Sequence, residues 1–224
     1  MNTSSNALAI WLKAREFVYD QLKKVFGNEP SEELLKSLSS YFFAQVLDMF
    51  EMFIEQEQLE SFKKLIDKLK KPTENALAEI KSEYTYLLIG PNKLPAPPWE
   101  SVYVNKAPVL FQKSTLKVRQ AYLKYNLLPL NYPHVADDHI ATELDFLANL
   151  AKLSVHAYMQ EDIPEVKKIL TDSKNFLDQH LLKWVGEFAK QIQQKNNHLY
   201  PQLAILTEQI AKADATMLEG VLKI

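Results

Sequence analysis

A proline-rich stretch interrupts an otherwise helix-forming chain at residues 91–108. Five of the eleven prolines fall there, and the whole sequence has only four glycines. Because proline fixes φ and lacks an amide hydrogen, this stretch cannot form the interior of a helix. We therefore predict one domain over residues 1–224, in which a connector at 91–113 joins possible subdomains at 1–90 and 114–224. Within the connector, Trp99 and its polar neighbours are typical of a recognition surface.

Apolar residues recur at helical spacing on both sides of the connector. Gly27 is predicted to end the first helix in the left-handed conformation, and Ser31 can cap a second helix that continues through residues 34–50. Thr73 can cap a later helix that ends at Gly90. No stretch shows the alternation of a β strand. The sequence therefore predicts an all-α protein, a compact multi-helix bundle of two halves with roughly eight to ten helices.

Composition excludes several classes of function. Hydrophobic residues make up 47% of the chain, so a sizeable core can form, yet no apolar run is long enough to cross a membrane. The net charge of −2 gives no sign of a nucleic-acid partner. Cysteine is absent, which fits a reducing compartment, and residues 1–12 lack the basic flank of a secretory signal. The four glycines are isolated, which excludes the usual phosphate-binding loops.

A short acidic and histidine-containing segment offers one alternative function. His139 and Glu143 are four residues apart and share a helix face, while Asp138 and His134 lie close in sequence. Such residues can ligate a metal ion, so a metal-dependent helical enzyme is the rival interpretation. The competing structural interpretation is that an aspartate caps a helix here while His139 and Glu143 are exposed or locally paired.

Several motifs together resemble the TorD/DmsD/NarJ family of chaperones for molybdenum oxidoreductases, and the resemblance covers most of the chain. The residues that carry it are Glu83-Tyr84-Thr85, Gly90-Pro91, Pro97-Pro98-Trp99-Glu100-Ser101-Val102-Tyr103, Ser114-Thr115-Leu116, Val118-Arg119, Tyr122, Asp137-Asp138-His139, Glu143-Leu144, Phe176-Leu177, His180-Leu181, Trp184 and Phe188. Where the family commonly has Glu-Pro before its Asp-Asp-His, this chain has Val135-Ala136, which removes one carboxylate.

The resemblance implies a cytoplasmic, all-helical protein that is not an enzyme and needs no cofactor or metal of its own. Its implied partners are the twin-arginine signal peptide and the body of a molybdenum oxidoreductase subunit, whose export it delays until the molybdopterin cofactor is inserted. A relative that serves a non-exported client is a further possibility. Neither nucleic acid nor stable membrane insertion is implied. A hinge at the connector would permit a monomer or a domain-swapped dimer.

A peptide-binding site follows from the resemblance and from residue chemistry. By position, the residues that match the family's peptide-binding region are Pro98, Trp99, Glu100, Asp138 and His139. A twin-arginine leader offers two guanidinium groups followed by an apolar segment, so its receptor needs carboxylates and an apolar groove. Asp137 and Glu143 add acid, and Tyr103 adds an aromatic wall. We expect all eight residues to lie at the junction of the two halves.

Overall fold

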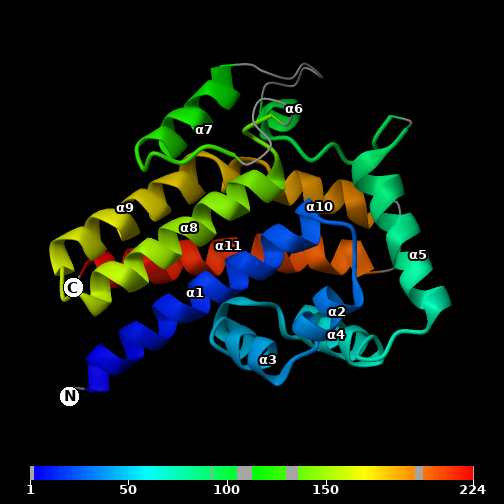
Figure 1. Ribbon diagram of the computed structural model, residues 1–224, viewed down its shortest axis with the longest axis horizontal. Coiled ribbons are helices and arrows are strands. Elements are labelled where there is room, and N and C mark those ends of the chain that lie inside the picture. The colour runs from blue at the N-terminus through cyan, green and yellow to red at the C-terminus, as the bar shows by residue number, and fades with distance from the viewer. Residues whose placement is uncertain (1–2, 92, 105–112, 130–135, 195–198, 224) are drawn as a thin grey trace.

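The protein is all-α, as the sequence predicts. The computed structural model describes residues 3–91, 93–104, 113–129, 136–194 and 199–223 (Figure 1). The helices are α1 (Thr3–Gly27), α2 (Glu32–Leu38), α3 (Tyr41–Asp48), α4 (Gln56–Lys68), α5 (Glu74–Tyr84), α6 (Glu100–Val104), α7 (Lys113–Leu123), α8 (Ile140–Met159), α9 (Ile163–Gln179), α10 (Val185–Gln193) and α11 (Leu199–Leu222). Short turns of 3₁₀-helix span Glu51–Phe53 and Leu181–Lys183, and a π-helical turn, η2, spans Thr85–Ile89. Over the described ranges there is no strand, only an isolated antiparallel bridge between Trp99 and His139.

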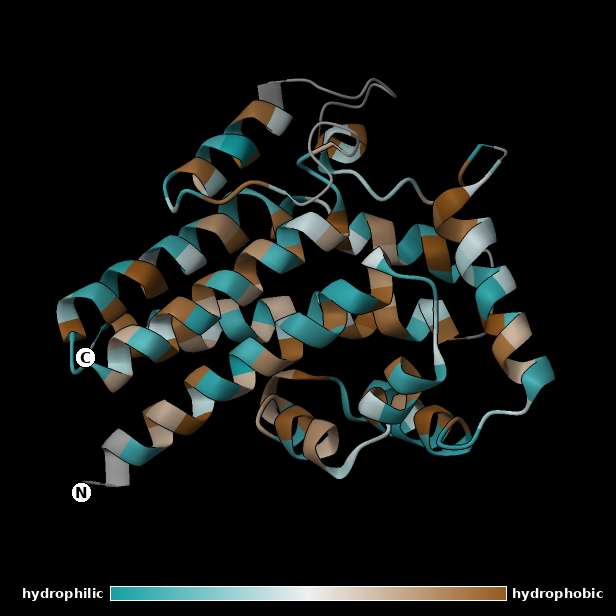
Figure 2. Ribbon diagram, in the orientation of Figure 1, coloured by the Kyte–Doolittle hydropathy of each residue, from teal (hydrophilic) through white to brown (hydrophobic). Residues whose placement is uncertain are grey.

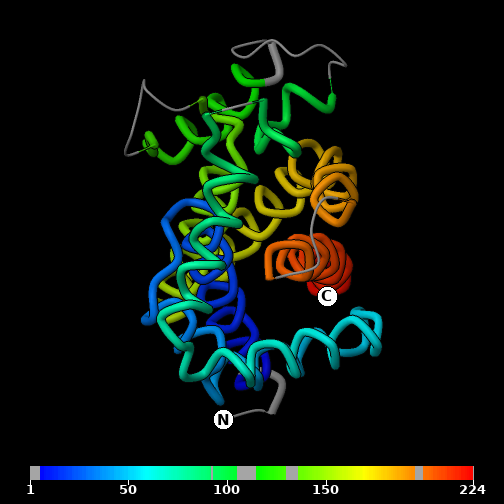
Figure 3. Tube along the Cα trace, turned by 90° about the vertical axis from the view of Figure 1, so that its right-hand side faces the viewer, coloured from blue at the N-terminus to red at the C-terminus, as the bar shows by residue number. Residues whose placement is uncertain are grey.

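Long helices from both sides of the connector form the body of the molecule. α1 lies along α8, α8 along α9, and α11 along α9 and α10. Figures 1 and 3 show α2, α3 and α4 at one edge of this body and α6 and α7 at the opposite edge. The apolar faces of the long helices turn inward (Figure 2), and residues from both halves share one core cluster. The division into two subdomains stays a prediction. None of the described helices is long and apolar enough to cross a membrane.

Gly27 differs from its prediction. It is the last residue of α1, and its φ is not positive, so it is no left-handed cap. A Cβ atom added at Gly27 would lie 3.1 Å from the Cβ of Ala141, at the start of α8. A larger residue at position 27 would be crowded, because the end of α1 approaches the start of α8 so closely that Ala141 would have to shift by a few tenths of an ångström. This contact also shows that α1 and α8 run antiparallel.

Side-chain caps form at the two helices where they are predicted, and a third cap begins a helix that was not predicted. The Ser31 hydroxyl accepts from the Leu34 amide at α2, and the Thr73 hydroxyl accepts from the Ala76 amide at α5. The single helix predicted through residues 34–50 is wrong, because Ser40 caps a separate helix, α3. Serine competes for backbone hydrogen bonds inside a helix, so it favours a new start there.

The connector is less uniform than predicted. Gly90 ends η2 with φ of 92°, a left-handed value that glycine adopts without strain. Directly after Pro98 and Trp99, however, the chain forms the short helix α6, so the expectation that the whole stretch is non-helical is wrong. Proline is excluded from a helix interior and disfavours helix at the residue before it, but a helix can begin two residues later.

Glu83 joins the N-terminal half to the last helix. Its buried carboxylate accepts hydrogen bonds from the backbone amides of Leu199 (3.2 Å) and Tyr200 (3.3 Å), which open α11. The first amides of a helix have no partner within the helix, and the helix dipole favours a negative charge there. Glu83 therefore acts as a helix cap supplied from a distant part of the chain.

Glu83→Ala is expected to lower the free energy of unfolding by about 1–3 kcal/mol, because it leaves buried amides unpaired. Urea unfolding followed by circular dichroism measures the loss. Glu79→Ala, at an exposed position on the same helix, is the matched control. Equal midpoints for the two variants would contradict the capping role.

Candidate functional site

The connector is fixed to the start of α8 by main-chain hydrogen bonds. The Glu100 amide donates to the Asp138 carbonyl (3.0 Å), and the Ile140 amide donates to the Pro98 carbonyl (2.9 Å). The side chains on this bridge also meet, since the Trp99 and His139 rings lie 5.7 Å apart in an edge-on arrangement. The structure thus brings together the two motifs that the sequence analysis assigned to one site.

The side chains of Asp138 and His139 each accept a hydrogen bond from a backbone amide in the first turn of a helix. An Asp138 carboxylate oxygen accepts from the Ser101 amide (2.8 Å) at the start of α6. His139 is the cap of α8, and its Nδ1 accepts from the Ala141 amide (3.1 Å). An Nδ1 that accepts leaves the proton of the neutral ring on Nε2, so Nε2–H is available as a donor. Burial lowers the pKa of His139 from 6.5 to about 4, so the ring is neutral at pH 7.

The four predicted carboxylates cluster, but they are covered. Asp137, Asp138 and Glu143 are 0% exposed and Glu100 is 2% exposed. Burial raises the pKa of the Tyr122 hydroxyl well above its usual value, and the nearby carboxylates of all four residues raise it further. The acids therefore surround one tyrosine beneath the surface and are not presented to solvent.

Three of these carboxylates have partners from other parts of the chain. Asp137 accepts from Arg119 on α7, with Nε at 2.8 Å and Nη2 at 2.6 Å. The Nδ1 atom of His180 lies 3.0 Å from Oε2 of Glu100. The Trp184 indole donates to Oε2 of Glu143 (3.2 Å). Burial, followed by the charge of Glu100, raises the pKa of Glu143 well above its usual value, although the Trp184 bond opposes this.

The remaining predicted residues separate into two groups. Pro98 is buried and Trp99 is partly exposed, both beside the α8 cap. Tyr103 points elsewhere, because its ring stacks on Trp184 at 5.4 Å and its hydroxyl donates to Gln191 (3.3 Å). Burial raises the pKa of that hydroxyl. Ala136 is buried, whereas His134 and Val135 lie outside the described residues.

A groove of about 430 Å³ opens beside His139. It lies between the end of α1, the η2 turn and the start of α8. Its lining residues are Lys23, Lys24, Phe26, Gly27, Asn28, Tyr84, Leu88, Ile89, Pro129, His139, Ala141, Thr142 and Asp145. Most of the exposed lining is apolar, and Ile89 at its edge is 62% exposed. Such a surface suits an apolar peptide segment.

Asp145 is a carboxylate at this groove that the sequence analysis missed. Its side chain is 44% exposed, and Oδ1 accepts from Lys23 (2.8 Å) and from Asn149 (3.2 Å). Asp145 lies two residues after Glu143, so it occupies a different face of α8. That face could be recognised only once α1, which carries Lys23, is known to lie beside α8.

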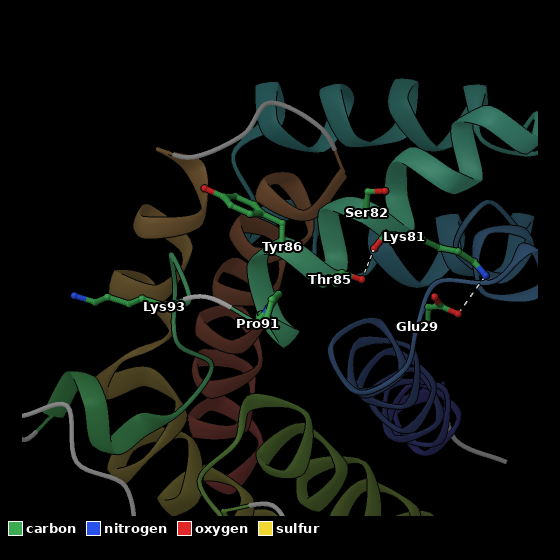
Figure 4. A pocket seen from close by; sticks show the side chains of 8 residues that line it. Glu29, Lys81, Ser82, Thr85, Tyr86, Pro91 and Lys93 are labelled. Atoms are coloured by element: carbon green, nitrogen blue, oxygen red, sulfur yellow. Dashed lines mark hydrogen bonds and ion pairs between the residues drawn. The ribbon is translucent and has the colours of Figure 1, made fainter.

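A second hollow, of about 510 Å³, lies on another side of η2 (Figure 4). Its lining includes Lys81, Tyr86, Pro91 and Lys93. The Lys81 ammonium reaches Glu29 (3.2 Å), and Figure 4 shows the Lys93 side chain extending away from the other lining residues. Because its charges are paired or directed outward, this hollow is less suited to hold a ligand than the groove beside His139.

The rival metal site is not assembled in the described part of the chain. No group of three or more histidine, aspartate or glutamate residues there is placed to hold a metal ion. His139 Nδ1 accepts from a backbone amide, and Glu143 Oε2 accepts from an indole. These atoms are used to cap and pack helices.

Comparison with known sequences identifies relatives along most of the chain. The sequence profile described as "Nitrate reductase delta subunit" matches residues 55–190. A protein from Haemophilus influenzae described as "Probable Tat proofreading chaperone DmsD" is 32% identical over 187 residues, covering 83% of this chain and 82% of its own. The protein described as "Chaperone protein TorD" from Aliivibrio salmonicida is 27% identical, covering 82% and 84%. Its counterpart from Aliivibrio fischeri is 27% identical, covering 96% and 99%.

Proposed function

We propose, from the premise that this chain belongs to the nitrate reductase delta subunit family together with the TorD and DmsD chaperones, that it is a cytoplasmic maturation chaperone for a molybdenum oxidoreductase. Its work is binding and not catalysis. It holds the unfinished enzyme by the twin-arginine signal peptide and by the body of the subunit. Export of the client then waits until the cofactor is in place.

The observation that carries the proposal is the position of His139, which Trp99 contacts, at a mostly apolar groove. The main-chain bridge holds Trp99 against His139, and His139 lines the groove itself. The apolar segment of a leader would lie along this wall, because burying apolar surface drives such association. The neutral His139 ring supplies a donor without repelling a cationic peptide.

The arginines of the leader need carboxylates, and the chain has two sets close to the groove. Asp145 lines the groove and is accessible. Glu100, Asp137 and Asp138 lie behind the bridge in the buried cluster and remain our candidates for pairing with guanidinium groups. Charge-assisted bonds of this kind are among the strongest hydrogen bonds in proteins.

Trp99→Ala is expected to lower the affinity for a leader peptide about 10- to 30-fold, since aromatic anchors carry most of the energy of such interfaces. Titration calorimetry with a synthetic peptide of two arginines followed by an apolar segment measures the change. Tyr41→Ala is the control, because Tyr41 is 79% exposed on α3, which lies at the edge opposite to α6.

Circular dichroism checks that both variants keep the fold. Equal affinity of the Trp99→Ala variant and the unchanged protein would remove Trp99 from the site. Co-purification from an anaerobically grown host tests the client directly, and mass spectrometry should find a large molybdenum subunit that still carries its leader. Recovery of that subunit without any peptide affinity would indicate that the chaperone reads the client's body surface.

A further inference from the structure

An arginine of the chain itself already occupies one of the predicted leader-binding carboxylates. Arg119 is one of only two arginines in the sequence. Its Nε and Nη2 atoms both bind the same Asp137 oxygen, Oδ2, at 2.8 and 2.6 Å. The Asp137 side chain is fully buried, whereas that of Arg119 is 27% exposed. The guanidinium therefore covers the carboxylate from the solvent side.

The cluster behind Arg119 has more acceptors than the described residues satisfy. In that part of the chain, Asp137 Oδ1, Asp138 Oδ1 and Ser101 Oγ are buried and have no hydrogen-bond partner. Unpaired buried acceptors are costly, and buried carboxylates especially so. A guanidinium group carries five N–H donors in a planar fork, which is the chemistry that these acceptors lack.

Arg119 lies on a helix at the edge of the molecule. α7 sits beside α6, away from the α1–α8 seam (Figures 1 and 3). Among its described side chains, Val118 and Tyr122 are buried, and the Tyr122 hydroxyl donates to the Asp137 carbonyl (2.8 Å). Its outer face is accessible and mixed, with Leu116 52% and Leu123 49% exposed beside the exposed Lys117 and Gln120. The Tyr122 ring packs on Phe146 of α8 (4.8 Å) and Phe176 of α9 (6.0 Å), so α7 is anchored to the long helices while the partly exposed Arg119 side chain lies nearer the solvent.

We propose that the Asp137 carboxylate is an exchangeable guanidinium site, filled by Arg119 in the free protein and by a leader arginine in the complex. The identity of the incoming group rests on the proposed function. The exchange replaces one charge-assisted bond by another of the same chemistry, so the acid is not left buried and unpaired at the end of the exchange. It also explains how carboxylates that are closed to solvent can take part in binding an external peptide.

The site is tested first without any peptide, by chemical rescue of Arg119→Ala. This variant should unfold at a lower temperature, and ethylguanidinium at about 10 mM, far below denaturing concentrations, should restore about 2–4 °C. Ethylammonium, which lacks the fork, should restore nothing. Lys117→Ala removes the same charge from an exposed position on α7 and should show neither loss nor rescue. If Arg119→Ala does not fold, Arg119→Lys, which keeps the charge without the fork, takes its place.

Exchange with a leader is tested next, by calorimetry with the two-arginine peptide. The Arg119→Ala variant lacks the internal competitor, so it should bind the peptide about 10-fold more tightly than the unchanged protein. The same change destabilises the fold. Asp137→Asn should weaken binding, and a peptide with two lysines should gain nothing from Arg119→Ala.

The outcomes separate the two proposals. Rescue together with tighter binding supports the exchange. Absence of rescue overturns the guanidinium site even if the peptide binds. Rescue without tighter binding overturns the exchange with a leader arginine. Rescue with no peptide binding by any form of the protein supports the site and rejects the leader-binding function.

Discussion

Asp214→Ala is expected to lower the free energy of unfolding by about 3–5 kcal/mol, because it leaves a buried arginine without its counter-ion. Arg15 on α1 donates to Asp214 on α11 through Nε (2.7 Å) and Nη2 (3.1 Å), and both residues are fully buried. The Tyr19 hydroxyl donates to the same carboxylate (2.8 Å). Burial, followed by the negative charge of Asp214, raises the pKa of Tyr19 well above its usual value.

Urea unfolding followed by circular dichroism measures this loss. Glu219→Ala removes a carboxylate from the same helix, where Glu219 pairs with Lys223 at the surface, and should leave the stability almost unchanged. Asp214→Asn keeps one acceptor and should fall between the two. A loss below about 1 kcal/mol in Asp214→Ala would show that Arg15 finds other partners or water.

The second large effect is a loss of stability in mild acid through His139. Its pKa is about 4 in the folded protein against 6.5 for the ordinary side chain, because burial disfavours the charged ring. The unfolded chain therefore takes up the proton at a higher pH than the folded chain. The contribution to stability is complete above pH 6.5 and is lost as the pH falls towards 4. Its size is about 3 kcal/mol, from the difference between the two pKa values.

His139→Asn isolates this contribution, because asparagine can also cap a helix but does not titrate. The free energy of unfolding should fall between pH 7 and pH 4 by about 3 kcal/mol more in the unchanged protein than in this variant. His156→Asn makes the same substitution at an exposed position on the same helix and is the matched control. Parallel profiles for His139→Asn and the unchanged protein would show that the ring titrates normally.

Local features of the fold were predictable from the sequence, and distant ones were not. Ser31, Thr73 and Gly90 act on their own neighbours, so cap chemistry identified their roles. The close approach of Gly27 to Ala141 joins residues that are far apart in the sequence, and no local pattern indicates it. The Arg15–Asp214 pair is likewise separated by 199 positions.

The candidate site shows the same division. The proline connector and the Asp-Asp-His motif were recognisable because chemistry and order were both visible in the sequence. Their burial was not, since exposure depends on which helix covers them, and α7 supplies the cover through Arg119. Asp145 was missed for a related reason, because its importance comes from Lys23 on α1 and from the groove between those helices.

Gly27 and Ala141 both line the groove beside His139 as well as sealing α1 to α8. Both residues are small, so a larger side chain at either position would take up space in the groove or between the two helices. A relative with a larger residue at either position would need a wider spacing between α1 and α8 or would have a smaller groove. Under the proposed function, the size of these two side chains would therefore bear on which leader segments fit the groove.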